Sequence, residues 1–188
     1  MTNKIIVVLG KKGSGKTYLV QNKILRLFPR MPKFIIDPLH EYSDGMIFES
    51  ATDLLRSYSQ KDNESNNYIL RSRSVDDIPN LLSALSKLKE EVVLVVEEVD
   101  QICNPSFIQP DLNWLIQYGR HVPINMIFLA RRASSINRNT TAQSDTIVSF
   151  KQTEPRDVKT LTERSEAFSK VSELGEYKYI VDGDSLKK

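Results

Sequence analysis

The sequence predicts an α/β fold in which a mostly parallel central sheet is flanked by helices on both faces. Two observations lead to this prediction. Several short runs are almost continuously apolar, as in parallel strands that are buried on both faces. Stretches with helical apolar spacing separate these runs, and strands that alternate with helices form parallel sheets. The chain shows no internal repeat and no low-complexity linker, so residues 1–188 are expected to form a single domain.

Each expected element follows from its own local pattern. The expected strands are short and rich in β-branched or aromatic residues, and they cover residues 5–9, 33–37, 68–70, 92–96, 124–130, 146–150 and 177–181. The expected helices repeat apolar residues every three or four positions, and they cover residues 18–28, a short segment after Ser50, and residues 78–88, 111–118 and 154–164. Two of them are expected to begin with capping-box pairs, Ser50 with Asp53 and Ser74 with Asp77.

A glycine-rich motif lies between the first expected strand and the first expected helix. Residues 10–17 read Gly-Lys-Lys-Gly-Ser-Gly-Lys-Thr and fit the phosphate-binding pattern G-x-x-x-x-G-K-[ST]. Backbone N–H groups and the positive end of the helix dipole would make this turn an anion site. The pattern predicts that Lys16 reaches the β- and γ-phosphates of ATP and that the Thr17 hydroxyl holds Mg²⁺. The residues expected to contact the nucleotide are Gly10, Lys12, Gly13, Ser14, Gly15, Lys16, Thr17 and Tyr18. A glycine turn that binds nothing is the alternative.

Two carboxylates follow the most apolar of the expected strands, residues 92–96. Ligands of open α/β sheets bind beyond the carboxyl ends of the strands, so Glu97 and Glu98 are expected at the same edge as the glycine-rich motif. Glu97 is expected to hold Mg²⁺, and Glu98 to act as the general base that polarises the attacking water. The usual order is Asp before Glu, and the extra methylene of Glu97 would shift its metal contact. The alternative is that both glutamates begin a solvated loop.

Bulk properties exclude several other classes of protein. A formal net charge of +2 excludes a strongly basic coat for nucleic acid but permits a local basic patch. No apolar stretch approaches the roughly 18 residues of a membrane span, and the N-terminus lacks the apolar region of a signal peptide, so we expect a cytosolic protein. Cys103 is the single cysteine, which excludes a disulfide framework, and we expect a buried or incidental thiol.

Over most of its length the chain resembles the FtsK–HerA superfamily of DNA-pumping ATPases. Besides the two nucleotide motifs, residues 35–42 (IIDPLHEY) resemble a family strand that ends in Asp-Pro-x-x-Glu-Tyr. Residues 119–134 resemble the stretch from an arginine-bearing helix end through the sensor strand, and residues 149–157 resemble the closing strand and helix. The resemblance implies a RecA/ASCE-like P-loop NTPase fold and an ATPase that couples hydrolysis to DNA translocation.

The resemblance also implies roles for two arginines. Arg120 would be an arginine finger that reaches the γ-phosphate bound by a neighbouring subunit, with a surface arginine at a helix end as the alternative. The family usually has Gln where this chain has Arg131, so the role of Arg131 stays open between a sensor, a second finger and a DNA contact. The candidate catalytic residues are therefore Glu98, Lys16, Arg120 and Arg131.

Within the superfamily, the chain resembles the minimal genome-packaging ATPases of viruses with an internal membrane. The implied partners are double-stranded DNA, further copies of the chain in a ring (a hexamer is favoured) and a capsid or vertex protein, and the implied location is the host cytoplasm or the virion. Candidate DNA contacts are residues 104–110, Arg132, Asn137 and Arg138, with solvated loops as the alternative. A DNA-pumping ATPase of chromosome or plasmid transfer, a phage-assembly ATPase and a small-molecule kinase are the other functions left open. A kinase is the least favoured of these, because the sequence shows no arginine-rich lid segment.

Overall fold

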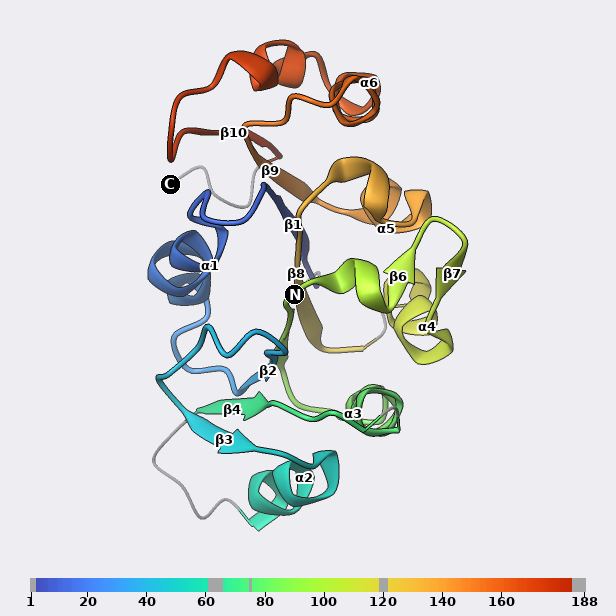
Figure 1. The fold of residues 1–188 in the computed structure, drawn as a ribbon. Helices are drawn as coiled ribbons and strands as arrows, with labels where there is room; N and C mark the ends of the chain where they lie inside the picture. Colours follow the sequence, from blue (N-terminus) through green and yellow to red (C-terminus); the bar gives the residue numbers. More distant parts are fainter. Residues whose placement is uncertain (1–2, 61–65, 75, 119–121, 184–188) are drawn as a thin grey trace. The chain divides into compact units, whose positions relative to one another are not determined.

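The structure is a computed structural model that describes residues 3–60, 66–74, 76–118 and 122–183 (Figure 1). The chain divides into two compact units, and each combines segments from distant parts of the sequence. Unit 1 comprises Met1–Asn3, Phe28–Glu97 and Gln109–Met126, and unit 2 comprises Lys4–Leu27, Glu98–Ile108 and Ile127–Lys188. We describe the two units separately, and the expectation of a single domain stays a prediction.

Unit 1 is built on parallel strands. Its hydrogen-bonded strands follow in the order β5 (Val92–Val96), β2 (Lys33–Ile36), β4 (Asn67–Leu70) and β3 (Met46–Phe48). All three neighbouring pairs are parallel. Strand β5 is buried along its whole length, which is why its sequence is a continuous apolar run. The helices of the unit are α2 (Ala51–Gln60), α3 (Asp77–Leu85) and α4 (Pro110–Tyr118).

Unit 2 contains the glycine-rich motif. Strand β1 (Ile5–Leu9) pairs in parallel with β9 (Thr146–Phe150), and β10 (Tyr179–Asp182) adds an antiparallel strand beyond β9. The end of β8 (Ile124–Ala130) lies on the other side of β1. Helices lie on both sides of β1, with α1 (Lys16–Leu19) on one side and α5 (Arg138–Gln143) on the other (Figure 1).

Short elements complete unit 2. After α1 the chain continues through a π-helical segment (Val20–Ile24) and a 3₁₀ turn (Leu25–Leu27). A second 3₁₀ turn, η3 (Val99–Gln101), leads into a small hairpin of β6 (Cys103–Asn104) and β7 (Phe107–Ile108). The remaining helical segments are η5 (Ala133–Ser135), α6 (Pro155–Arg164) and η6 (Glu166–Glu173).

The fold class that the sequence predicts is confirmed. The strands are mostly parallel and helices flank them, and each expected strand is present with small shifts at its ends. Strand β3, the β6–β7 hairpin, α5 and η6 were not predicted, because each is short or lacks a clear apolar period. Within the described ranges, every helix is too short or too polar to cross a membrane.

The predicted capping pair of Ser74 and Asp77 is wrong. The Ser74 hydroxyl accepts a hydrogen bond from the Asp76 N–H at 3.3 Å, outside the helix. The Asp77 carboxylate is 9% exposed and accepts the N–H of Ala51 at 3.0 Å. Asp77 therefore joins the start of α3 to the start of α2, so that a tertiary contact replaces the local cap.

Candidate nucleotide-binding site

The glycine-rich motif forms a loop between the end of β1 and α1. The N–H of Gly10 donates to the carbonyl of Ala130 at 3.1 Å, which fixes the start of the loop against the end of β8. The N–H of Ser14 closes a turn on the carbonyl of Lys11 at 3.1 Å. Gly15 has a φ of 96°, a left-handed conformation that glycine adopts without steric cost. Turns of this kind direct successive backbone N–H groups toward one concavity, where an anion can bind.

The loop contains a buried hydroxyl that lacks a partner. The Oγ of Ser14 is buried and has no hydrogen-bond partner among the described residues. The surroundings are tight, because a Cβ added at Gly10 would lie 2.5 Å from this oxygen and 2.8 Å from the Cβ of Phe150. A buried hydroxyl without a partner costs about 1–3 kcal/mol. An oxygen-rich ligand such as a phosphate would satisfy it, which supports the expectation that Ser14 contacts a nucleotide.

Lys16 begins α1 and lies against the loop. Its side chain is largely buried, with the residue 8% exposed, and Nζ donates to the carbonyl of Lys11 at 3.4 Å. A buried ammonium group next to a phosphate-binding loop adds positive charge at the place where an anionic ligand would bind. The neighbouring Thr17 is half-buried. The phosphate contacts expected of Lys16 and the metal contact expected of Thr17 stay predictions.

A basic cleft of about 550 Å³ opens over the loop. Four lysines from three segments of unit 2 contribute to its lining, and Glu176 is the one carboxylate among the described residues that line it. These lysines are Lys11, Lys12, Lys151 and Lys178. An excess of positive charge next to a phosphate-binding loop is the electrostatic environment that a polyphosphate chain requires. Lys12 was expected from the sequence, whereas Lys151 and Lys178 were not.

An aromatic cavity of about 450 Å³ adjoins the basic cleft, with which it shares Phe150 and Tyr177. Tyr18 and Tyr177 are 70% and 66% exposed, an unusual position for large aromatic rings. The ring of Tyr177 lies close to the loop, because a Cβ added at Gly15 would be 3.4 Å from its Cδ1. A nucleobase commonly binds by stacking on aromatic side chains. Sequence reasoning found Tyr18 but missed Phe150 and Tyr177.

Tyr179 and Lys23 close the far side of the aromatic cavity. The Nζ of Lys23 donates to the hydroxyl of Tyr179 at 3.0 Å and lies 5.6 Å from the centroid of its ring. This hydrogen bond is the main cause of a raised pKa for Lys23. The ammonium therefore stays charged at neutral pH and adds a cation beside the aromatic surface.

Glu98 lies at the same edge of the sheet as the glycine-rich loop. The N–H of Gly10 is hydrogen-bonded to the carbonyl of Ala130, and Arg131 directly follows Ala130 in the chain. The Nε of Arg131 lies 2.9 Å from one carboxylate oxygen of Glu98 and 3.1 Å from the other. The Glu98 side chain is 8% exposed, whereas that of Arg131 is 49% exposed. Gln152 also fixes this corner by donating to the carbonyl of Arg131 at 3.0 Å. The structure thus brings two candidate catalytic residues into direct contact.

The backbone of Glu98 is strained. Its φ of 49° and ψ of 50° are left-handed, and such values are uncommon for a residue with a side chain. Strain of this kind costs about 1–3 kcal/mol, and it concentrates at functional sites where the surrounding structure enforces it. The preceding residue, Glu97, belongs to unit 1.

Glu97 is 3% exposed and has its own surroundings in unit 1. Its N–H donates to the carbonyl of Ile36 at 3.1 Å. Burial is the main cause of a strongly raised pKa for Tyr42, and the charge of Glu97 is the next largest contribution. Asp37 accepts N–H groups from Glu41 at 2.8 Å and Tyr42 at 3.2 Å. The expected contact of Glu97 with a metal stays a prediction.

The residues predicted to hold Mg²⁺, Thr17 and Glu97, belong to different units, and their joint contact with the ion stays a prediction. No group of three or more His, Cys, Asp or Glu side chains could hold a metal anywhere in the described part of the chain. Mg²⁺ does not need such a group, because it usually binds one or two protein oxygens together with substrate phosphates and waters. Thr17 and Glu97 offer an oxygen donor each. Arg120, the proposed finger, lies outside the described residues, so its placement stays a prediction.

A glycine-rich loop between a buried parallel strand and a helix, with a glutamate directly after another buried parallel strand, defines the class of P-loop NTPases. A family model described as Poxvirus A32 protein matches residues 2–177. The chain therefore belongs to the Poxvirus A32 protein family. A comparison with curated proteins gave no match.

Solved structures share the fold. The genome packaging NTPase B204 of Sulfolobus turreted icosahedral virus 2, in complex with ATP-gammaS, has a TM-score of 0.80 at 23% identity, over 95% of this chain and 91% of that one. VirB4 of Thermoanaerobacter pseudethanolicus has a TM-score of 0.60 at 12% identity, over 97% of this chain and 89% of that one. The N-terminal domain of zonular occludens toxin from Neisseria meningitidis reaches 0.51 at 14% identity, over 81% and 78%. At these identities the likeness establishes the fold.

Proposed function

We propose that the protein hydrolyses ATP to move double-stranded DNA, as the packaging motor of a viral genome. The observation that carries the proposal is the junction of Gly10, Ala130, Arg131 and Glu98, which places a carboxylate and a cation at the edge where the phosphate loop begins. Membership in the Poxvirus A32 protein family and the likeness to a genome packaging NTPase support the choice of substrate.

The phosphate loop binds and positions the triphosphate. Lys16 and the lysines of the basic cleft neutralise its charge, and the Ser14 hydroxyl contacts a phosphate oxygen. The base stacks in the aromatic cavity against Tyr177. Thr17 and Glu97 would hold Mg²⁺, and the ion would supply positive charge against the phosphates.

Glu98 accepts a proton from the water that attacks the γ-phosphate. Arg131 controls the access of water to Glu98, because its Nε contacts both carboxylate oxygens. We infer that Arg131 moves from Glu98 to the γ-phosphate when ATP binds, since the triphosphate offers this exposed cation a second anion. The side chain of Arg131 is half-exposed, so this transfer requires no movement of the core. Arg131 would then act as the sensor whose role the sequence left open.

The motor works as a homo-oligomeric ring, for which we favour a hexamer. In such a ring Arg120 reaches the γ-phosphate held by the adjacent subunit, and a finger of this kind is worth about 10³–10⁵ in rate in other nucleotide hydrolases. A capsid or vertex protein would hold the ring at the site of DNA entry. The ring, the Arg120 finger and the capsid or vertex protein are further parts of the proposal, and the contacts within unit 2 do not bear on them.

The proposal is tested by steady-state ATP hydrolysis with and without double-stranded DNA. Wild-type protein should hydrolyse ATP, and DNA should stimulate it. Glu98→Gln should lower kcat by about 10²–10⁴, the usual contribution of a general base, while ATP still binds. Glu166→Gln, an exposed glutamate in η6, is the matched control and should keep wild-type turnover. Unchanged turnover in Glu98→Gln, or a complete lack of DNA stimulation, would overturn the proposal.

A further inference from the structure

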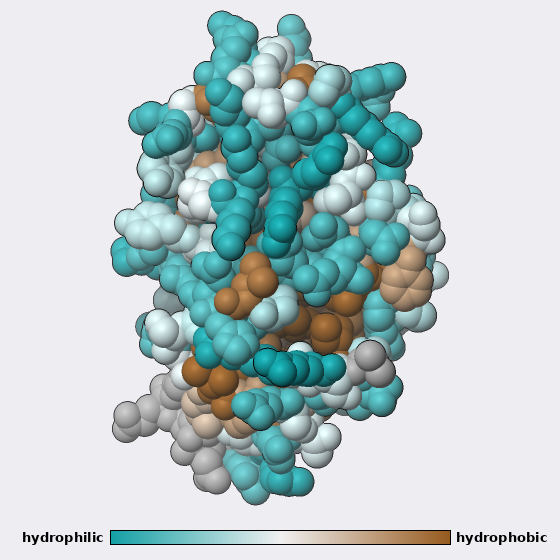
Figure 2. All heavy atoms as spheres, in the orientation of Figure 1, coloured by the Kyte–Doolittle hydropathy of each residue, from teal (hydrophilic) through white to brown (hydrophobic). Residues whose placement is uncertain are grey.

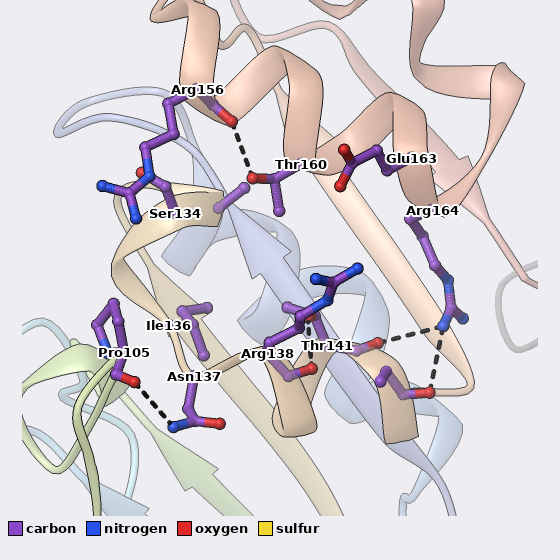
Figure 3. Close-up of a pocket in the computed structure, with 12 residues that line it drawn as sticks. Pro105, Ser134, Ile136, Asn137, Arg138, Thr141, Arg156, Thr160, Glu163 and Arg164 are labelled. Carbon is purple, nitrogen blue, oxygen red and sulfur yellow. Dashed lines mark hydrogen bonds between the residues drawn. The ribbon is translucent and has the colours of Figure 1, made fainter.

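A second basic depression lies in unit 2, away from the phosphate loop. It has a volume of about 500 Å³ and is open to solvent between α5, α6, η5 and the turn of the β6–β7 hairpin. Figure 3 shows three arginines spaced along it, with Arg156 and Arg164 toward its two ends and Arg138 between them. We call this depression the arginine groove. In the space-filling view, hydrophilic side chains dominate the surface over this part of unit 2 (Figure 2).

The three arginines differ in what holds them. Arg164 is a structural residue, because it donates to the carbonyls of Thr141 at 3.2 Å and Ser144 at 2.8 Å and lies 3.3 Å from Asp182. Arg138 and Arg156 are exposed, and neither forms an ion pair with any residue that the structure describes. Two guanidinium groups are therefore available to a ligand.

The charge of the groove is unbalanced. Glu163 is the one carboxylate in its lining among the described residues, and it lies 3.9 Å from Lys159 in an exposed pair. The three arginines and one glutamate leave a net charge of +2 in the lining. Positive charges that share a concave surface repel one another, and a bound anion removes this repulsion. The groove thus fits a negatively charged ligand.

We propose that the arginine groove binds the sugar–phosphate backbone of double-stranded DNA. Its other polar lining groups include Ser134, Asn137 and Thr160, and arginine, serine, threonine and asparagine are the side chains that usually contact DNA phosphates. The groove has no aromatic residue among its described lining, so it lacks the stacking platform of a single-strand or nucleotide site. Such contacts carry no sequence information, which suits a protein that must move along any sequence.

A series of side-chain contacts connects the groove with the proposed nucleotide site. The inference rests on the proposed function, because it assigns the DNA that the motor would move to this groove. Asp157 is fully buried at the start of α6, next to Arg156. Its carboxylate accepts hydrogen bonds from the Nε–H of Arg132 at 2.9 Å and from the backbone N–H of Ser134 at 2.8 Å. Arg132 directly follows Arg131, which holds Glu98. One short segment therefore connects the wall of the groove to the proposed general base.

The experiment measures how the affinity for a 30-base-pair duplex of random sequence depends on salt. Each lost phosphate contact reduces the slope of log K against log salt by about 0.9. Arg138→Gln with Arg156→Gln should therefore reduce the slope by about 1.8. When salt is raised from 50 to 200 mM, the affinity of both proteins should fall, and the fold-loss should be about twelve times smaller for the double variant than for the wild type. ATP turnover without DNA should be unchanged, because neither arginine lies in the nucleotide site.

Two further variants make the result specific. Arg26→Gln with Arg30→Gln removes the same charge from exposed positions outside the groove and should keep the wild-type slope. Arg138→Lys with Arg156→Lys keeps the charge and should also keep the slope. Equal slopes in the groove variant and the wild type would overturn the inference, as would an equal reduction in the charge-matched control. If the wild type itself fails to bind DNA, the proposed function and the inference both fail, whereas equal slopes with DNA binding retained overturn the inference alone.

Discussion

The basic cleft over the phosphate loop and the arginine groove differ in how they are built, although both belong to unit 2. The cleft is centred on backbone geometry, with the left-handed Gly15 and the buried Ser14 hydroxyl beside it. The groove is made almost entirely of side chains from α5, α6 and the turn before them. Its free cations, Arg138 and Arg156, are exposed.

This difference corresponds to two kinds of phosphate recognition. A backbone cradle holds one polyphosphate in a fixed orientation, which hydrolysis requires because the attacking water and the γ-phosphate must be aligned. Exposed arginines hold phosphates that pass from one contact to the next, which translocation requires. The comparison predicts that changes in the cradle have larger effects than changes in the groove.

Within the two basic regions, the largest effect is expected for Lys16→Ala. Loss of this buried cation removes charge stabilisation from the transferred phosphate and should lower kcat by about 10²–10³, measured as steady-state ATP hydrolysis. Lys12→Ala is the control in the same loop, and its exposed side chain should contribute much less. Similar losses in both variants would show that the loop acts through net charge and not through a positioned ammonium group.

Asp157→Ala tests whether the Asp157 carboxylate holds residues 132–134 in place at the wall of the arginine groove. The buried carboxylate holds Arg132 and the N–H of Ser134, and hydrogen bonds to a charged group contribute about 1.5–3 kcal/mol. The free energy of unfolding in urea should fall by about this amount. Asp53→Ala removes an exposed carboxylate paired with Arg56 and should change stability by less than about 1 kcal/mol. A stable Asp157→Ala variant would refute the role of this aspartate in fixing the segment.

Gly10→Ala tests the close packing of the cradle. The added Cβ would lie 2.5 Å from Ser14 Oγ and 2.8 Å from Phe150 Cβ, and overpacking of this kind costs about 1–3 kcal/mol. Urea unfolding should show this loss. Gly175→Ala is the matched control, because its nearest neighbour would be the Cγ of Lys178 at 4.0 Å. If both variants are equally stable, the loop adapts more readily than its geometry indicates.

The smallest effect is expected for Tyr177→Ala. Loss of a stacking ring costs about 1–3 kcal/mol for a bound base, so the affinity for ATP should fall by about tenfold. The affinity for inorganic tripolyphosphate, which has no base, should not change. Tyr177→Phe keeps the ring and should bind ATP like the wild type. An equal loss for ATP and tripolyphosphate would place Tyr177 at the phosphates and not at the base.

Residues that act through backbone position were the easiest to predict from the sequence. The loop requires glycine at left-handed positions, so its spacing identifies Gly13 and Gly15 without any structure. The buried strands were equally clear, because an apolar run such as β5 has few other uses. The prediction that Glu98 lies at the edge of the sheet followed from its position directly after that strand.

Residues that meet through tertiary contacts could not be predicted. Tyr177 and Phe150 lie in different segments. The parallel pairing of β9 with β1 brings Phe150 to the loop, and the antiparallel pairing of β10 with β9 brings Tyr177 there. Asp157 is far in sequence from Arg132, and neither position has a local pattern that points to the other. The pairing of Arg131 with Glu98 was likewise missed, although the departure from the family's usual Gln had marked Arg131 as unusual.

DNA stimulation of ATP hydrolysis, titrated with double-stranded DNA, tests most directly whether these two basic regions serve one motor. The wild type should be stimulated, and Arg138→Gln with Arg156→Gln should keep the basal rate but need several-fold more DNA for half-maximal stimulation. Identical titration curves for the two proteins, or no stimulation of the wild type, would contradict the account.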